Sequence, residues 1–149
     1  MNKIAIKFQR LAHASDLALP SYATDGAVGI DIAAAIDRPM CIQPRTIMAI
    51  PTGFAMELPA GYEAQIRPRS GLALKHGVTI ANAPGTIDSD YRGEIAVILL
   101  NNGIRAFTIT RGMRIAQMVI AAVTIMIPIE VDDLDETERA AGGFGSTGL

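Results

Sequence analysis

Acidic, aromatic and basic side chains crowd into one short stretch in the middle of the chain. Asp88, Asp90, Tyr91 and Arg92 lie within five positions, and an apolar run follows at residues 95–100. A run of this kind forms a buried strand, so the acids stand at the entrance to the core. A carboxylate placed there loses hydration, which suggests a chemical role for Asp88. A hairpin with hydrated acids at its tip is the alternative.

A second candidate site is Arg67-Pro68-Arg69-Ser70-Gly71. We expect a strand to end before Pro68 and two helical turns to follow, with Ser70 as N-cap and Gly77 just past the end. Backbone N–H groups at a helix start, beside a hydroxyl and guanidinium groups, bind anions. An ordinary capped helix with hydrated arginines would explain the same residues.

The C-terminal tail, residues 139–149, has the composition of an anion-binding loop. Its glycines leave room for backbone N–H groups to approach an anion, and Arg139, Ser146 and Thr147 add a charge and two hydroxyls. Phe144 is a lone aromatic residue that can stack on a flat ring. No lysine follows the glycines, so this is not a Walker A motif. A disordered tail is the alternative.

Gln117 is a polar residue inside a predicted apolar strand that begins at Arg114, and it faces either solvent or a ligand. Taken together, the two anion-binding segments, the stacking aromatic residue and the isolated carboxylates describe a nucleoside polyphosphate carried with Mg²⁺. The cofactor fits because Mg²⁺ commonly keeps phosphate oxygens and waters as ligands and needs few carboxylates from the protein.

The composition predicts one domain with an aliphatic core. The 149 residues are half hydrophobic and only 5% aromatic, and so much apolar surface favours burial between subunits as well as within one. The net charge of -2 predicts no broad attraction to nucleic acid or an anionic membrane. The single cysteine, Cys41, excludes an intrachain disulfide, and we expect it to be a small buried residue.

Short β-branched runs separated by Gly and Pro predict an all-β, jelly-roll-like barrel or sandwich with one short helix. Strands are expected near residues 4–8, 62–67, 78–81 and 107–110, and across 114–129. We therefore expect one β domain over residues 1–129. Six acids within residues 130–138 then mark a hydrated linker to the mobile tail. With no signal-peptide core and no apolar run long enough to span a bilayer, the cytoplasm is the expected compartment.

Five segments of the chain resemble, in order, the five motifs of the trimeric dUTPases. The resemblance implies a homotrimer with shared active sites that uses Mg²⁺ to hydrolyse dUTP to dUMP and pyrophosphate. It also implies that the enzyme limits uracil incorporation into DNA and supplies dUMP for thymidylate synthesis. Val28 and Ala140 depart from the residues that the family more often has, without touching a catalytic atom. The segments are residues 29–32, 68–77, 82–94, 111–117 and 139–148.

The resemblance also assigns roles to residues. Asp88 would be the general base for in-line water attack on the α-phosphorus, with Ser70 and Gln117 completing the catalytic set. Asp31 would bind Mg²⁺ through a water, and Tyr91 would pack under the deoxyribose and exclude a 2′-hydroxyl. The tail would close over a neighbouring subunit's site, with Phe144 stacked on uracil. The other substrate-binding residues implied are Arg69, Gly71, Asn82, Thr86, Ile87, Arg139, Gly145, Ser146 and Thr147.

Two other functions share parts of this pattern. A dCTP deaminase carries a Thr-Leu-Glu sequence after the third motif, and the stretch from Glu94 to Ile98 here lacks it. A non-catalytic, regulatory nucleotide-binding trimer would tolerate loss of Asp88, Ser70 or Gln117, and all three are present. Asp90 acquires no chemical role from the resemblance, and we expect it to be structural, pairing with an arginine.

Overall fold

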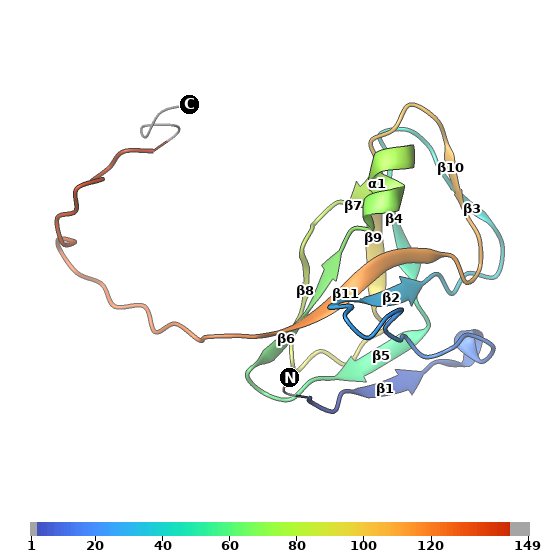
Figure 1. Cartoon of the computed structure of the whole chain (residues 1–149), viewed down its shortest axis with the longest axis horizontal. Helices are drawn as coiled ribbons and strands as arrows, with labels where there is room; N and C mark the ends of the chain where they lie inside the picture. Colours follow the sequence, from blue (N-terminus) through green and yellow to red (C-terminus); the bar gives the residue numbers. More distant parts are fainter. Residues whose placement is uncertain (1–2, 144–149) are drawn as a thin grey trace.

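The computed structural model describes residues 3–143 and contains eleven strands, one short 3-10 helix and one α-helix (Figure 1). This confirms the predicted all-β class with a single short α-helix. None of the described helices is long and apolar enough to cross a membrane. The elements are β1 (Lys7–Arg10), η1 (Ala12–Ala14), β2 (Ile30–Ala33), β3 (Met40–Ile42), β4 (Ile47–Pro51), β5 (Phe54–Glu57), β6 (Tyr62–Arg67), α1 (Ser70–His76), β7 (Val78–Ile80), β8 (Gly85–Ile87), β9 (Ala96–Asn101), β10 (Phe107–Ile109) and β11 (Arg114–Ala122).

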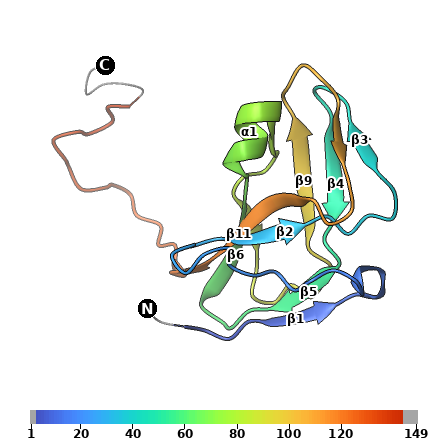
Figure 2. The same cartoon turned by 45° about the vertical axis from the view of Figure 1, so that its right-hand side comes forward.

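The strands pair antiparallel in four small sheets. The largest has the order β2-β11-β6-β8, a second has the order β4-β9-β7, and β1-β5 and β10-β3 form two-stranded pairs. In both views α1 lies at the end of the domain opposite β1 and β5, with β2 and β11 between them (Figures 1 and 2). The long strand β11 pairs on one side with β2 and on the other with β6, so it connects the predicted site segments.

The core between the sheets is aliphatic, as the composition predicts. In β9, buried Val97 and Leu99 alternate with Ala96 and Ile98, which are more exposed, so the apolar run after Glu94 is a strand with one buried face. β11 adds the buried side chains of Ile115, Ala116 and Met118. Other buried members of the cluster are Ile32, Ile42, Ile50, Ile66, Val78, Ile80, Ile109 and Ile87.

Asn101 is a fully buried polar side chain at the end of β9. Its Nδ2 donates to the carbonyls of Ile42 and Arg105 at 2.9 and 2.8 Å, and its Oδ1 accepts from the Gly103 N–H at 2.9 Å. The turn that Asn101 shapes packs closely against the end of α1. A Cβ added at Gly77 would lie only 2.6 Å from the Gly103 nitrogen. The buried amide therefore stabilises the turn against which the only α-helix among the described residues packs.

We expect Asn101→Leu to lower the free energy of unfolding by about 3 kcal/mol, because a leucine leaves two carbonyls and one N–H without their partners. Urea denaturation at matched protein concentration measures this change. Asn102→Ala, at the exposed neighbouring position, is the control and should stay within about 0.5 kcal/mol of the unmodified protein. A loss below about 1 kcal/mol for Asn101→Leu would contradict the assigned role.

Three expectations from the sequence are wrong in detail. Cys41 is exposed, because in β3 it takes the outward position beside buried Ile42. Ser70 is the first residue of α1 and Arg69 is the N-cap, without a side-chain capping bond. The last strand ends at Ala122, because the chain leaves the sheet after Val123 donates to the Gly61 carbonyl at 2.9 Å.

Arg111 ties the segment before β11 to the loop around η1. Its Nε donates to one carboxylate oxygen of Asp16 at 3.0 Å, and its Nη2 donates to the other and, at 2.6 Å, to the His13 carbonyl. The hydrogen bonds from Arg111 lower the pKa of Asp16 from 3.8 to about 2. The side chain of His13, held in this way, contacts Glu94, whose Oε1 lies 2.9 Å from His13 Nε2.

Candidate active site

A polar groove of about 300 Å³ lies along α1, and we call it the α1 groove. Arg69, Lys75 and His76 supply basic groups to it, Gln117 supplies an amide, and no acidic side chain from residues 3–143 lines it. Such a groove fits an anion with several oxygens, because guanidinium and ammonium groups bind phosphate through charge-assisted hydrogen bonds. The remaining lining residues are Ser70, Gly71 and Leu72.

Local backbone geometry presents the first turn of α1 to the groove. β6 ends at Arg67, Pro68 cannot continue the ladder, and Arg69 remains extended with φ -89° and ψ 124°. Ser70 and Gly71 then start the helix as exposed residues, and no helix residue is buried. The helix ends as predicted at Gly77, whose φ of 68° lies in the left-handed region.

Gln117 reaches the α1 groove from β11. It is half-buried and lies opposite Arg67 of β6 on one side and Asp31 of β2 on the other. A Cβ at Gly29 would come within 3.3 Å of the Gln117 Cβ, so the glycine leaves space beside this side chain. Gln117 thus lines the groove, as the predicted role in substrate binding requires.

Asp31 is held by two guanidinium groups. Its Oδ1 accepts from Arg69 Nε at 3.1 Å, its Oδ2 accepts from Arg114 Nη1 at 2.9 Å, and its side chain is 13% exposed. Arg69 also donates to the Arg114 carbonyl at 3.2 Å. The carboxylate therefore holds in place Arg69, one of the residues that line the groove, a role that the sequence did not reveal.

This donor set bears directly on the expected Mg²⁺. No cluster of three or more His, Cys, Asp or Glu side chains that could hold a metal occurs among residues 3–143. With both oxygens of Asp31 engaged by arginines, a direct bond to a metal would compete with two ion pairs. The residues fit an ion that keeps phosphate oxygens and waters as ligands, with Asp31 acting through a water.

The third predicted segment forms a separate surface, the acidic turn, which we define as residues 88–94. Asp88 is exposed and directly follows β8, and its carbonyl accepts the Tyr91 N–H at 3.2 Å. Tyr91 is 46% exposed, and its hydroxyl donates to the Glu94 carbonyl at 3.0 Å. Asp88 and Tyr91 are therefore two exposed residues of one turn.

The residues before this turn differ in what they offer a ligand. The Ile87 side chain is buried in the core, so only its backbone can meet a substrate, whereas Thr86 is exposed. The Asn82 amide lies against Gly85, where a Cβ would come within 3.2 Å of its Nδ2. Asn82 is thereby held beside the backbone of β8, which the resemblance assigns to uracil.

Asp90 forms none of the ion pairs within the described part of the chain, so the expected pairing with an arginine is wrong. The nearest arginine in sequence, Arg92, instead donates to the carbonyls of Ser89 and Tyr91 at 2.7 and 2.9 Å. Its guanidinium stabilises the backbone of the acidic turn and leaves the Asp90 carboxylate hydrated.

A single chain does not bring Asp88 to the α1 groove. Strand β6 pairs with both β8 and β11, so it gives a common scale for the two segments. Ile87 of β8 lies opposite Ala64, which puts Asp88, the next residue, near the level of Glu63. Gln117 of β11 lies opposite Arg67. Four residues separate these levels, which is about 13 Å along β6 at 3.3 Å per residue. The strand register therefore places Gln117 and the start of the acidic turn of one chain well apart along the sheet.

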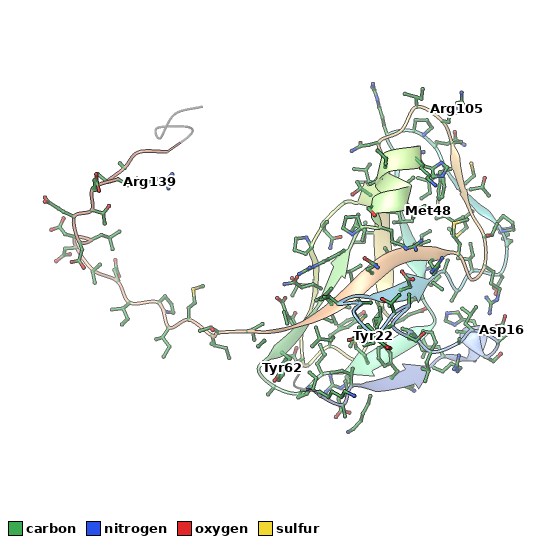
Figure 3. All side chains as sticks on the ribbon, viewed as in Figure 1. Asp16, Tyr22, Met48, Tyr62, Arg105 and Arg139 are labelled. Atoms are coloured by element: carbon green, nitrogen blue, oxygen red, sulfur yellow. The ribbon has the colours of Figure 1, made fainter. Side chains whose placement is uncertain are left out.

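The described part of the C-terminal tail, residues 139–143, is also remote from the groove in one chain. Residues 123–143 extend away from the domain, and Arg139 lies far from it (Figure 3). Arg139 Nε donates locally to the Gly142 carbonyl at 2.9 Å. The predicted ligands Phe144, Gly145, Ser146 and Thr147 lie outside the described residues.

Sequence reasoning gave no role to Lys75, His76 or Arg114. Lys75 lies four residues after Gly71, which places both on one side of a helix. The predicted helix could therefore have indicated that Lys75 faces the same ligand as Gly71. Arg114 acts through Asp31, a contact between β11 and β2 that no local pattern reveals.

Together, the antiparallel fold and the basic groove define an all-β domain with a site that fits an anion with several oxygens. A family model described as dUTPase matches residues 15–148. The chain is 58% identical over 142 residues to the deoxyuridine 5′-triphosphate nucleotidohydrolase of Sinorhizobium medicae, covering 94% of this chain and 89% of the relative. Identity to the enzyme of that name from Caulobacter vibrioides is 56% over 148 residues, covering 98% and 96%. The chain belongs to the dUTPase family of enzymes.

Solved structures share the fold at low sequence identity. A variant of the Staphylococcus bacteriophage 80alpha dUTPase with dUpNHpp matches with a TM-score of 0.87 and 22% identity, covering 99% of this chain and all of that one. A variant of the phage phi11 dUTPase, described with a structural Mg(II) ion, matches with a TM-score of 0.77 and 21% identity, covering 87% and 98%.

Proposed function

We propose that the protein hydrolyses dUTP to dUMP and pyrophosphate by in-line attack of water on the α-phosphorus. The observation that carries this proposal is the α1 groove, where Ser70, Gly71 and Gln117 meet the basic side chains of Arg69 and Lys75. Membership of the dUTPase family supports dUTP as the substrate. A phage dUTPase variant of the same fold is described with dUpNHpp. In the cytoplasm, the proposed compartment, this reaction would limit uracil incorporation into DNA and supply dUMP for thymidylate synthesis.

The residues of the groove bind and orient the phosphates. Arg69 and Lys75 neutralise negative charge, the Ser70 hydroxyl and the Gly71 N–H donate to phosphate oxygens, and the Gln117 amide holds a phosphate or the water. When bound, Mg²⁺ supplies further neutralisation of the phosphate charge, with Asp31 holding it through a water. Positioning and charge neutralisation account for most of catalysis in reactions of this class.

Asp88 takes the proton of the attacking water as general base. The water oxygen forms a bond to the α-phosphorus while the bond to the bridging oxygen breaks, and pyrophosphate leaves. Tyr91 packs under the deoxyribose, while Asn82, Thr86 and the backbone at Ile87 contact the uracil. In this mechanism the acidic turn supplies the base and the specificity, and the α1 groove supplies the phosphate contacts.

A homotrimer completes the site in our proposal. Since about 13 Å of strand separates Asp88 from the level of Gln117, the base must come from a neighbouring subunit. The exposed apolar side chains of Ile125, Met126, Ile127 and Ile129 support burial against another copy. The tail then reaches a third subunit, with Phe144 stacked on uracil and with Arg139, Gly145, Ser146 and Thr147 near the phosphates.

Pyrophosphate release measured side by side with dUTP, dTTP, dCTP and UTP tests the proposal. We expect rapid release with dUTP and little with the other three nucleotides. Tight dUTP binding without release would favour a non-catalytic regulatory trimer. Ammonia production from dCTP would indicate a deaminase.

We expect Tyr91→Ala to narrow the preference for dUTP over UTP by roughly tenfold, because the smaller side chain leaves space for a 2′-hydroxyl. The ratio of kcat/KM for the two nucleotides measures this change. Tyr22→Ala removes an exposed tyrosine from the N-terminal loop and is the matched control (Figure 3). An unchanged ratio for Tyr91→Ala would mean that another group excludes the 2′-hydroxyl.

A further inference from the structure

The ring of Tyr91 lies directly on the backbone of Gly93. A Cβ added at Gly93 would stand 2.3 Å from the Tyr91 hydroxyl oxygen, 2.6 Å from Cζ and 3.0 Å from Cε2. Contacts this short do not occur between real side chains, so any residue with a Cβ at position 93 would displace the ring. The observed place of Tyr91 therefore requires glycine at this position.

A second contact holds the outer end of the ring. The Tyr91 hydroxyl donates to the Glu94 carbonyl at 3.0 Å, so the backbone of Gly93 and Glu94 forms a shelf under the side chain. The shelf is fixed to the domain, because Glu94 Oε1 accepts the Gly53 N–H at 2.8 Å and lies 2.9 Å from His13 Nε2. The backbone of Gly93 and Glu94 thus positions the Tyr91 ring.

The arrangement allows the ring to move without damage to the core. Tyr91 is 46% exposed, and Gly93 is itself exposed. Among the described glycines, those with left-handed φ are Gly53, Gly61, Gly77 and Gly112. Gly93 is not one of them, so alanine fits its backbone conformation. A methyl group at position 93 would therefore swing the ring outward while the fold is kept.

We propose that Gly93 is a specificity-determining residue that positions Tyr91 against the sugar of the substrate. The inference rests on the proposed hydrolysis of dUTP and on the place of Tyr91 under the deoxyribose. Gly93 acts only through Tyr91, and its effect is on the choice between deoxyribose and ribose. A general loss of stability would lower activity with both sugars alike, and this distinguishes the two kinds of effect.

The test compares kcat/KM for dUTP and UTP in Gly93→Ala. We expect the preference for dUTP to narrow by roughly tenfold, with a melting temperature close to that of the unmodified protein. The double variant Tyr91→Ala/Gly93→Ala should narrow it no further than Tyr91→Ala alone, because both changes act through one side chain. Gly26→Ala is the control, since a Cβ there meets nothing within 4 Å.

Ring resonances of labelled tyrosine in the nucleotide-free protein provide a readout independent of activity. Gly93→Ala should shift the Tyr91 resonance, and Gly26→Ala should not. Normal dUTP hydrolysis with an unchanged dUTP/UTP ratio would overturn the role of Gly93 alone, whether or not the ring shifts. Absence of dUTP hydrolysis by the unmodified protein would overturn the proposed function and, with it, the specificity role.

Discussion

We expect Asp88→Asn to lower dUTP turnover by roughly 10²–10⁴-fold while nucleotide binding is kept, because it removes a positioned general base without changing the shape of the side chain. Asp88 is exposed at the end of β8 and forms no ion pair within residues 3–143, so the fold does not depend on its charge. Steady-state kcat for pyrophosphate release and calorimetric binding of a non-hydrolysable analogue measure the two effects.

Asp90→Asn is the matched control, because Asp90 is exposed in the same turn and likewise unpaired among the described residues. It removes the same charge two positions away and should leave turnover near normal. Near-normal turnover in Asp88→Asn would remove this residue from the proposed mechanism. An equal loss in both variants would point to the net charge of the turn instead of one base.

Mixed assemblies extend this test to the shared site. Asp88→Asn chains keep an intact α1 groove, and Ser70→Ala chains keep an intact base. If each site combines the groove of one subunit with the acidic turn of another, random trimers of the two inactive chains regain about a quarter of their sites. No recovery after joint refolding would contradict the proposal that Asp88 serves a neighbouring groove.

We expect a chain that ends after Glu138 to stay folded and assembled but to lose turnover, by on the order of 10²-fold, because closure over the site would no longer orient the substrate. The described part of the removed segment is exposed or half-buried, and its hydrogen bonds are local, such as the one from Arg139 to the Gly142 carbonyl. Removal therefore takes nothing from the core. Thermal unfolding, size-exclusion chromatography and kcat/KM with dUTP measure the three properties.

A chain lacking only Leu149 is the control for this truncation, because the family match ends at residue 148. It should retain full activity. Unfolding of the chain that ends after Glu138 would show that the tail stabilises the domain. Full activity of that chain would remove the tail, and with it Phe144, from the proposed site.

Elements with strong local signals were predictable. The alternation over residues 62–67 became β6 within the predicted bounds, because one face of the strand must be buried and the other hydrated. The helix after Pro68 ends at Gly77, where a left-handed φ favours glycine. The groove residues Ser70 and Gly71 were also predictable from local sequence, since both lie at the start of the predicted helix.

Signals that depend on non-local pairing were not predictable. Cys41 is exposed because β3 turns Ile42, its neighbour, toward the core, and composition does not specify which face of a strand is buried. Asp90 lacks its expected arginine because Arg92 bonds to the backbone of its own turn. Local charge patterns identify candidate partners, but geometry chooses among them.

By itself the sequence determined the all-β class, the short helix and the chemistry of the candidate residues, because these follow from side-chain type and local period. Only the tertiary structure decided how those residues combine. Strand register separates Asp88 from Gln117, and the turn lays Tyr91 on Gly93. The place of β2 beside β11 and the start of α1 gives Asp31 its two partners, Arg114 and Arg69. Each depends on contacts between segments distant in sequence or on side-chain packing, which local periodicity does not encode.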